Sequence, residues 1–252
     1  MRNIRNSLHK KLLPQPKRAF EKANGAIIAA TSGIREEIHR CYGVDSQVVP
    51  EVGPPDFTTR DYSLRKPGES LKLAWSGLHL PGKALPFLLQ ALSSLRHTVS
   101  FHLDILGAGP CTRKWQKLAV RLGIARKCAW HGWLPRKEAL ELVGRAHVFI
   151  ITSVKDLTST VLLEALALGL PVICPDHCGF ADVVTAECGI KVRFDFPRQI
   201  AMDLAEAIKR LDDDEQERRR LARGALQRSK DFSWERKAEV ICTVYEKAVA
   251  NS

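Results

Sequence analysis

The stretch ITSVKDLTSTVLLEALALGLPVICPDHCGFAD, Ile151 to Asp182, decides how this chain can fold. Its polar start leads into an apolar helical run, which ends at Gly169 and Pro171. A short β-rich run, Val172 to Cys174, follows and leads into a second polar loop, Pro175 to Gly179. Because two polar loops flank one helix and one strand, we expect this stretch to form a ligand-binding edge of an α/β sheet.

The same alternation continues on both sides of this stretch. The predicted strands are Leu71–Trp75, Ser100–Leu106, Cys128–Trp130, Ala146–Ile151 and Gly189–Val192, and the predicted helices are Pro86–Leu95, a basic helix ending at Leu122, Arg136–Gly144 and Arg198–Leu211. Strands and helices in this rhythm predict the α/β class, with a Rossmann-like parallel sheet covered by helices on both faces. Such sheets bind ligands beyond the carboxyl ends of their strands.

The first part of the chain repeats the pattern on a smaller scale. Gly25–Ala30 and Gln47–Pro50 are predicted strands, and Ser32 is the predicted cap of a helix over Gly33–Cys41 that Gly43 ends. Two strands and one helix cannot bury a core of their own. We therefore expect an incomplete α/β remnant of a larger domain, followed by a polar linker.

Composition narrows the classes of protein. Of the 252 residues 45% are hydrophobic, and Lys and Arg (39) exceed Asp and Glu (28) by 11, which favours anionic partners. No apolar run approaches the ~20 residues that cross a bilayer, and no signal-peptide pattern follows the basic start, so we expect a cytoplasmic protein. Seven irregularly spaced cysteines predict reduced thiols. For residues 1–22 we expect either a solvated helix or frayed leader, or a basic amphipathic element that rests on anionic lipid.

Two segments have the composition of phosphate-binding loops. Gly107-Ala-Gly109-Pro110 follows a strand and has three interpretations: a dinucleotide site, a tight turn that opens a helix, or a loop that borders a nucleotide. In the opening stretch, Leu157 to Thr160 lies where a helix begins, so free N–H groups and hydroxyls would face an anion. Glu164 would then accept hydrogen bonds from vicinal hydroxyls. The alternative is that Asp156 and Thr158 or Ser159 only cap the helix, with Glu164 solvated.

At these residues the chain resembles the retaining, GT-B-fold glycosyltransferases of family four, also called group 1. Their carboxy-terminal domain has a Glu-(seven residues)-Glu signature followed by Ala-(Met/Leu)-Ala-x-Gly-x-Pro-Val. The matching segments here are Asp156 to Glu164, Ala165–Val172, Leu106–Pro110, His131–Pro135, Trp75–Lys83 and Phe232–Arg236. Several ordered motifs over residues 71–250 make the resemblance specific.

The resemblance implies a role for each matching residue. Glu164 would bind the ribose of a nucleotide-diphospho-sugar donor, Asp156 would meet the donor sugar, and Lys83 would neutralise the leaving diphosphate. Asp156 and Lys83 would be catalytic, and no metal or cofactor is implied. The other implied donor-binding residues are Gly77, Gly107, Gly109, His131, Gly132, Trp133, Leu157, Thr158, Ser159, Thr160, His177 and Gly179.

It also implies a division of the chain. Residues 1–53 would be a remnant of the amino-terminal acceptor domain, 54–70 a linker, 71–232 the nucleotide-sugar-binding domain, and 233–252 a helix that crosses back to the amino-terminal domain. Two departures stand out. The family's Gly-Arg-Leu is Gly77-Leu78-His79 here, so that Lys83 acts alone or His79 or another base substitutes, and most of the acceptor half is missing.

We therefore predict a hexosyl-type glycosyltransferase, incomplete or inactive as an isolated chain, with retention implied by the resemblance alone. The alternative is a non-catalytic nucleotide-sugar-binding or partner-docking module, such as one subunit of a split enzyme. Besides the nucleotide-sugar, the expected partners of this protein are a separate acceptor domain and an anionic membrane surface at the inner membrane face. We expect no zinc at Cys174, His177, Cys178 and Cys188, a solvated face at Asp212–Asp214, and no nucleic acid partner.

Overall fold

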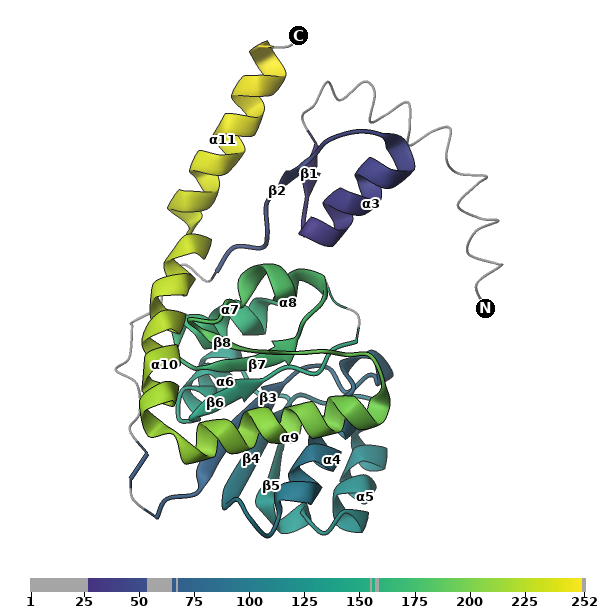
Figure 1. The fold of residues 1–252 in the computed structure, drawn as a ribbon, viewed down its shortest axis with the longest axis vertical. Helices are drawn as coiled ribbons and strands as arrows, with labels where there is room; N and C mark the ends of the chain where they lie inside the picture. The colour runs from purple at the N-terminus through teal and green to yellow at the C-terminus, as the bar shows by residue number, and fades with distance from the viewer. Residues whose placement is uncertain (1–26, 54–64, 67, 155, 157–158, 251–252) are drawn as a thin grey trace.

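The computed structural model describes residues 27–53, 65–66, 68–154, 156 and 159–250. Six parallel strands form one sheet in the order β5-β4-β3-β6-β7-β8 (Figure 1). They are β3 (Leu71–Ser76), β4 (Phe101–Leu106), β5 (Cys128–Gly132), β6 (Val148–Ile150), β7 (Val172–Pro175) and β8 (Gly189–Val192). The predicted α/β sheet is confirmed, and its strand order reverses between β3 and β6, where open sheets of this kind bind ligands.

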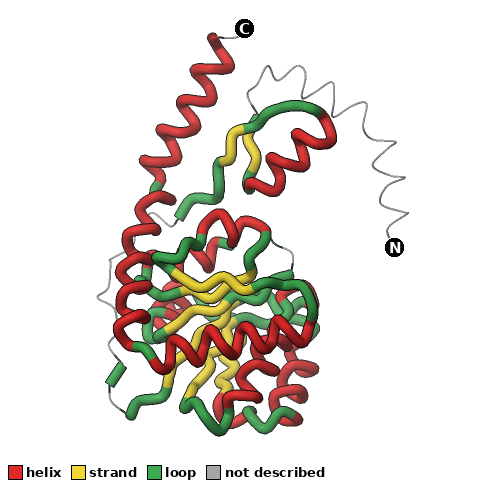
Figure 2. Tube along the Cα trace, in the orientation of Figure 1, coloured by secondary structure: helices red, strands yellow, loops and turns green. Residues whose placement is uncertain are grey.

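Helices cover both faces of this sheet, as predicted (Figure 2). The first face carries α4 (Leu85–Leu95), α5 (Thr112–Arg121) and α9 (Pro197–Asp213), and the second carries α6 (Arg136–Val143), α7 (Thr160–Ala167), α8 (Cys178–Val183) and α10 (Glu215–Ser229). Alternation along β3 explains the two layers: Leu73 and Trp75 enter the first core, and Ala74 enters the second. Because helices cover both apolar faces of the sheet, only the ends of the strands and the loops that follow them are available for polar functional groups.

The amino-terminal unit, residues 27–53, is small. Strands β1 (Ile28–Ala29) and β2 (Gln47–Val48) pair in parallel and flank α3 (Ser32–Tyr42), which lies next to α8 (Figure 1). Gly43 ends α3 as predicted, with a φ of 68° and its N–H donating to the His39 carbonyl. The predicted cap is wrong. Thr31 has the extended backbone of an N-cap and accepts from Ile34 N at 3.2 Å.

The carboxy-terminal helix α11 (Trp234–Ala250) follows a 3₁₀ turn, Lys230–Phe232, and extends away from the sheet past the amino-terminal unit (Figures 1 and 2). Gly53 N donates to Phe232 O at 2.7 Å where the two units meet. A hollow of about 360 Å³ separates the β2 end of the unit from α11. Among the described residues, no helix is long and apolar enough to cross a membrane.

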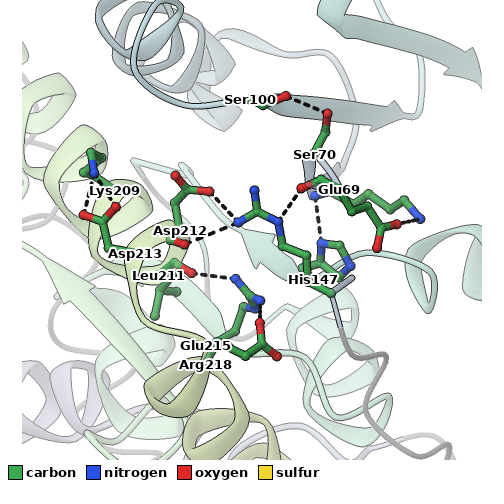
Figure 3. Close-up of polar contacts among 12 residues, drawn as sticks. Glu69, Ser70, Ser100, His147, Lys209, Leu211, Asp212, Asp213, Glu215 and Arg218 are labelled. Atoms are coloured by element: carbon green, nitrogen blue, oxygen red, sulfur yellow. Dashed lines mark hydrogen bonds and ion pairs between the residues drawn. The ribbon is translucent and has the colours of Figure 1, made fainter. Parts of the chain in front are cut away.

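Charged residues also gather at the amino-terminal edge of the sheet (Figure 3). Arg65 donates to the carboxylate of Asp212 at 2.5 Å, and His147 accepts from Lys72 N at 3.0 Å. Arg218, 1% exposed, donates to the Leu211 carbonyl at 2.7 Å and also pairs with Glu215. The first contact ties the segment before β3 to the end of α9, the second ties β3 to the residue before β6, and the contacts of Arg218 tie α10 to α9.

The predicted solvated face at Asp212–Asp214 is therefore wrong in part. Asp212 is largely buried in its pair with Arg65. Asp213 is exposed and pairs with Lys209, while Asp214 caps α10 by accepting from Glu217 N at 2.9 Å. Each carboxylate has a structural partner, which accounts for the acidic run without a metal.

Candidate functional site

The loops that follow five neighbouring strands meet at the carboxyl edge of the sheet. Their described residues are 77–84 after β3, 107–111 after β4, 133–135 after β5, 151–154, 156 and 159 after β6, and 176–177 after β7. Each loop is hydrogen-bonded, through its own residues or the strand end beside it, to the next, so they form one row along the edge. The predicted site residues that the structure describes lie in this row, at the end of β5 or in the helices that begin at the row.

The loop after β3 and the loop after β6 are joined most closely. The buried indole of Trp75 donates to Thr152 Oγ1 at 2.9 Å, and that hydroxyl donates to the Lys83 carbonyl at 2.7 Å. Val154 N donates to Gly82 O at 2.8 Å. The backbone of Lys83 is therefore fixed beside the start of the stretch that leads to Asp156.

Lys83 and Asp156, the two predicted catalytic residues, are in direct contact. Lys83 Nζ lies 2.5 Å from Asp156 Oδ2, and the side chains are 26% and 20% exposed. An ion pair that water reaches contributes little net stability, about 0–1 kcal/mol, because both charges remain partly hydrated. The ammonium can therefore exchange its carboxylate for an anionic ligand at low cost.

The described part of the start of α7 shows no side-chain cap. Its N-cap residue, Ser159, has an extended backbone, and its side chain makes no capping hydrogen bond. Thr160 is exposed, and the first turn contains no acid. Capping by Ser159 is therefore contradicted, whereas capping by Asp156 or Thr158 stays a prediction. The free N–H groups of a helix start favour an anion. Leu157 and Thr158 lie outside the described residues.

Glu164 lies one turn further along α7, and it is not solvated. Its side chain is only 13% exposed, and Oε1 accepts from Arg136 Nε at 3.0 Å. Burial raises the pKa of Glu164, and the hydrogen bond and charge of Arg136 oppose that rise. A partly desolvated carboxylate held between α6 and α7 is a strong acceptor for hydroxyl groups.

Arg136 is a site residue that sequence reasoning missed. It is the first residue of α6, directly after the motif His131–Pro135, and its side chain remains largely exposed. In the sequence, the feature that could have identified Arg136 is its position as a cation directly after the donor-loop motif His131–Pro135. Its guanidinium both orients Glu164 and adds a positive charge to the row of loops.

Two glycines allow the loops after β3 and β4 to pack against each other. Gly107 has a φ of 102°, and a Cβ there would lie 2.1 Å from Gly77 O. A Cβ on Gly109 would lie 2.7 Å from His79 O. Backbone hydrogen bonds run between the same loops, from Gly77 N to Leu106 O and from His79 N to Ala108 O. The glycine pattern is thus required by loop packing, whatever ligand lies beyond it.

His79 does not replace the missing arginine of the family motif. Its side chain is buried among the rings of Trp75, Trp115 and Trp130, with centroid distances of 5.1–5.8 Å. Burial lowers the pKa of His79, and Nδ1 shares a hydrogen bond with Thr112 Oγ1 at 2.7 Å. A neutral, enclosed imidazole cannot neutralise a phosphate, so Lys83 is left as the cation of its loop.

The loop after β5 presents an exposed aromatic ring. His131 Nε2 donates to Asp104 Oδ1 at 2.6 Å, which fixes the imidazole to β4. Gly132 has a φ of 68°, and its carbonyl accepts from Gly107 N at 2.7 Å. Trp133, next in the chain, is 76% exposed. Only Trp133 of these three residues offers an apolar face free for stacking on a ligand.

The loop after β7 is shorter than predicted, because α8 begins at Cys178. His177 is the N-cap residue of α8, and its Nε2 donates to Val154 O at 2.9 Å. Cys178 has a positive φ of 55°, and Gly179 is buried within α8. Within the described ranges, no group of three or more His, Cys, Asp or Glu residues is arranged to hold a metal ion.

Comparisons with known proteins agree with this geometry. The family described as "Glycosyl transferases group 1" matches residues 57–228. D-inositol 3-phosphate glycosyltransferase of Stackebrandtia nassauensis is 28% identical over 244 residues, covering 89% of this chain and 54% of that protein. MMP alpha-(1->4)-mannosyltransferase of Mycolicibacterium hassiacum is 28% identical over 179 residues, covering 71% of this chain and 43% of that protein. The chain spans about half the length of the curated relatives it matches.

Solved structures show the same fold at low identity. A glycosyltransferase from Rickettsia africae superposes with a TM-score of 0.76 at 17% identity, covering 98% of this chain and 68% of that chain. Anabaena Alr3699/HepE in complex with UDP has a TM-score of 0.72 at 16% identity, covering 92% of this chain and 66% of that chain. Both the fold and the family match, and the chain belongs to the glycosyl transferases group 1.

Proposed function

We propose that this chain binds the nucleotide-diphospho-sugar donor of a hexosyl transfer at the carboxyl edge of its sheet. The observation that carries the proposal is the ion pair of Lys83 with Asp156, shortly before the start of α7, where the N-cap residue Ser159 makes no capping hydrogen bond. Lys83 and the N–H groups of residues 157–160 would hold the diphosphate. Glu164 would bind the ribose, and Trp133 would flank the base.

These groups suit a reaction whose barrier is the charge on the leaving group. The bond between the anomeric carbon and the diphosphate oxygen breaks, and its electron pair goes to that oxygen. An acceptor hydroxyl forms the new bond to carbon and gives its proton to the departing diphosphate oxygen, with retained configuration as expected from the resemblance. Lys83 and the α7 dipole would stabilise the developing phosphate charge. Asp156, released from Lys83, would contact the sugar.

The acceptor side of the reaction belongs to the same proposal. The amino-terminal unit has two short strands and one helix, which buries no residue, and the relatives are about twice as long. We propose that a separate acceptor domain completes the enzyme, so that the isolated chain transfers no sugar. The alternative is a donor-binding subunit that docks on a partner without chemistry of its own.

The cellular setting belongs to the same proposal. We place the protein in the cytoplasm, peripherally at the inner membrane face, where the basic residues 1–22 would meet anionic headgroups. That segment lies outside the described residues. Co-sedimentation with vesicles containing anionic lipid, compared with neutral vesicles, tests it, and equal binding to both would contradict it.

Calorimetry with nucleoside diphosphates tests the donor site. UDP is the first probe, because the Anabaena neighbour is a complex with UDP, and GDP and ADP complete the panel. We expect Glu164→Ala to weaken binding roughly tenfold or more, since hydrogen bonds to a carboxylate contribute about 1.5–3 kcal/mol. The matched control is Glu138→Ala, an exposed carboxylate in the first turn of α6.

Two outcomes would contradict the proposal. If none of the three nucleotides binds at millimolar concentration, the carboxyl edge is not a donor site. If Glu138→Ala weakens binding as much as Glu164→Ala, the effect is not that of a ribose contact. A separate assay for sugar transfer by the isolated chain distinguishes the enzyme from the docking subunit, because measurable transfer would show that no further domain is needed.

A further inference from the structure

The amino end of α3 is held by a residue of the sheet domain. Asp182, near the end of α8, accepts from Ser32 N through Oδ2 at 2.7 Å and from Ser32 Oγ through Oδ1 at 2.5 Å. The two residues are 150 positions apart in the chain. A carboxylate at a helix start satisfies an N–H group that has no partner within the helix and faces the positive end of the helix dipole.

Among the described residues, α3 lies against β1, β2 and α8 without a buried face of its own. Its first turn contains no acid of its own, and none of its residues is buried. Thr31 satisfies one N–H group locally, that of Ile34. Because apolar packing normally supplies most of a helix's stability, a helix without a buried face depends on its caps and docking contacts. Asp182 is the carboxylate that supplies both.

Asp182 is itself held from behind. Arg228, near the end of α10, donates from Nη2 to Asp182 O at 2.8 Å and from Nε to Val183 O at 2.9 Å. Its guanidinium also lies 4.9 Å from the centroid of Phe232, whose carbonyl accepts from Gly53 N. Two contacts therefore connect the amino-terminal unit to the sheet domain at neighbouring places: Ser32 with Asp182, and Gly53 with Phe232. Arg228 contacts both Asp182 and Phe232, so it stabilises both connections.

The opposite end of α8 touches the candidate donor site. His177, the N-cap residue of α8, donates to the carbonyl of Val154, two residues before Asp156. α8 has six residues, so one short rigid element contacts the loop after β6 at one end and α3 at the other. A shift of that loop when an anion displaces Asp156 from Lys83 would be passed to α3 through α8.

We propose that Asp182 is a positioning residue that docks the amino-terminal unit on α8 of the sheet domain, and that α8 couples occupancy of the donor site to the dock. The dock rests on the contacts of Ser32 alone, whereas the coupling rests on the proposed donor function. Donor binding would tighten the dock and so set the acceptor-side unit in place before transfer.

Hydrogen–deuterium exchange of the full chain tests the dock without a ligand. We expect Asp182→Ala to accelerate exchange in α3 about fivefold, the effect of losing a helix cap, with β3 and β4 unchanged as internal references. Asp182→Asn should fall in between, because its amide oxygen still accepts from Ser32 N. The control Asp213→Asn removes an exposed carboxylate that pairs with Lys209, and it should leave α3 unchanged.

A double-mutant comparison checks that the two residues act as a pair. Ser32→Ala removes one of the two hydrogen bonds, so its effect on α3 exchange should largely vanish when Asp182 is already alanine. Fully additive effects, or exchange in Asp182→Ala equal to the unsubstituted protein, would overturn the dock.

Addition of UDP tests the coupling. In the unsubstituted protein we expect UDP to slow exchange in both α8 and α3. In Asp182→Ala we expect UDP to slow exchange in α8 only. Slowing in α8 but not in α3 of the unsubstituted protein would overturn the coupling and leave the dock. If calorimetry shows no binding of UDP, GDP or ADP, the donor function is refuted. The exchange measured without ligand would still show whether Asp182 docks the amino-terminal unit.

Discussion

The two edges of the sheet both collect charged residues, but they use them differently. At the amino edge, Arg65 and Arg218 donate to backbone carbonyls as well as to carboxylates, and Arg218 is fully enclosed (Figure 3). At the carboxyl edge, Lys83 and Arg136 each pair with one carboxylate, and both side chains remain within reach of water.

This difference indicates which charges a ligand can use. A charge that satisfies buried carbonyls cannot leave without exposing unpaired polar groups, so it belongs to the fold. A charge paired with a single accessible carboxylate can exchange that partner for a phosphate or a hydroxyl. We therefore expect substitutions at the amino edge to affect stability, and substitutions at the carboxyl edge to affect binding.

The largest effect is expected at Arg218. Arg218→Ala should lower the free energy of unfolding by about 3–5 kcal/mol, because it leaves the Leu211 carbonyl and Glu215 without their enclosed partner. Urea denaturation measures the change. The neighbouring exposed Arg219→Ala is the control and should stay within about 0.5 kcal/mol. A loss below about 1 kcal/mol for Arg218→Ala would contradict the expectation that charges at the amino edge stabilise the fold.

His147 should give the amino edge an acid-sensitive stability. Burial, aided by the charge of Arg218, lowers the pKa of His147 from 6.5 to about 4. Between these values the unfolded chain binds a proton that the native protein does not, so stability falls as the pH falls. At about 1.4 kcal/mol for each pH unit, roughly 3 kcal/mol is lost across this window.

The matched variant for this prediction is His147→Asn, whose amide oxygen can still accept from Lys72 N. Urea denaturation at pH 7 and pH 4.5 should show a smaller acid loss in the variant than in the unsubstituted protein. An equal acid loss in both proteins would assign the effect to other groups.

Lys83 should affect binding and hardly affect stability. We expect Lys83→Ala to weaken UDP binding roughly tenfold to hundredfold in calorimetry, because it removes a charge-assisted contact to phosphate. Its free energy of unfolding should change by less than about 1 kcal/mol. Lys137→Ala, an exposed cation on α6, is the control and should bind UDP normally. A stability loss as large as that of Arg218→Ala would break the comparison.

The smallest effect is expected for the ion pair itself. A double-mutant cycle with Lys83→Met and Asp156→Asn should give a coupling energy below about 1 kcal/mol in the ligand-free protein. Thermal or urea unfolding of the four proteins provides the cycle. A coupling of several kcal/mol would mean that Asp156 holds Lys83 too firmly for a phosphate to replace it.

The strands of the sheet could be predicted because each is an apolar run bounded by Gly, Pro or polar residues. β3, β4, β7 and β8 lie within one residue of their predicted limits at each end. The positions of Lys83, Glu164 and Trp133 at the carboxyl edge followed from the same pattern together with the motifs. What is local in the chain was therefore predictable.

The pairings could not be predicted in this way. Asp156 lies 73 residues from Lys83, Glu164 lies 28 from Arg136, and Asp182 lies 150 from Ser32. The error at the α3 cap has the same origin: Asp182 engages the Ser32 hydroxyl, which leaves Thr31 as the cap. The sequence shows which hydrogen bonds and ion pairs a side chain could form, and only the folded structure shows which partner it has.

The seven free cysteines divide by accessibility in a useful way. Cys174 is buried, and burial raises its pKa well above the usual range, while the pKa of Cys128 rises to about 12, so both thiols resist alkylation. Cys41 on α3 and Cys242 on α11 are exposed. A fluorophore or spin label added at neutral pH should therefore favour these two helices, and the native protein offers a ready reporter pair for the distance between its amino-terminal unit and its last helix.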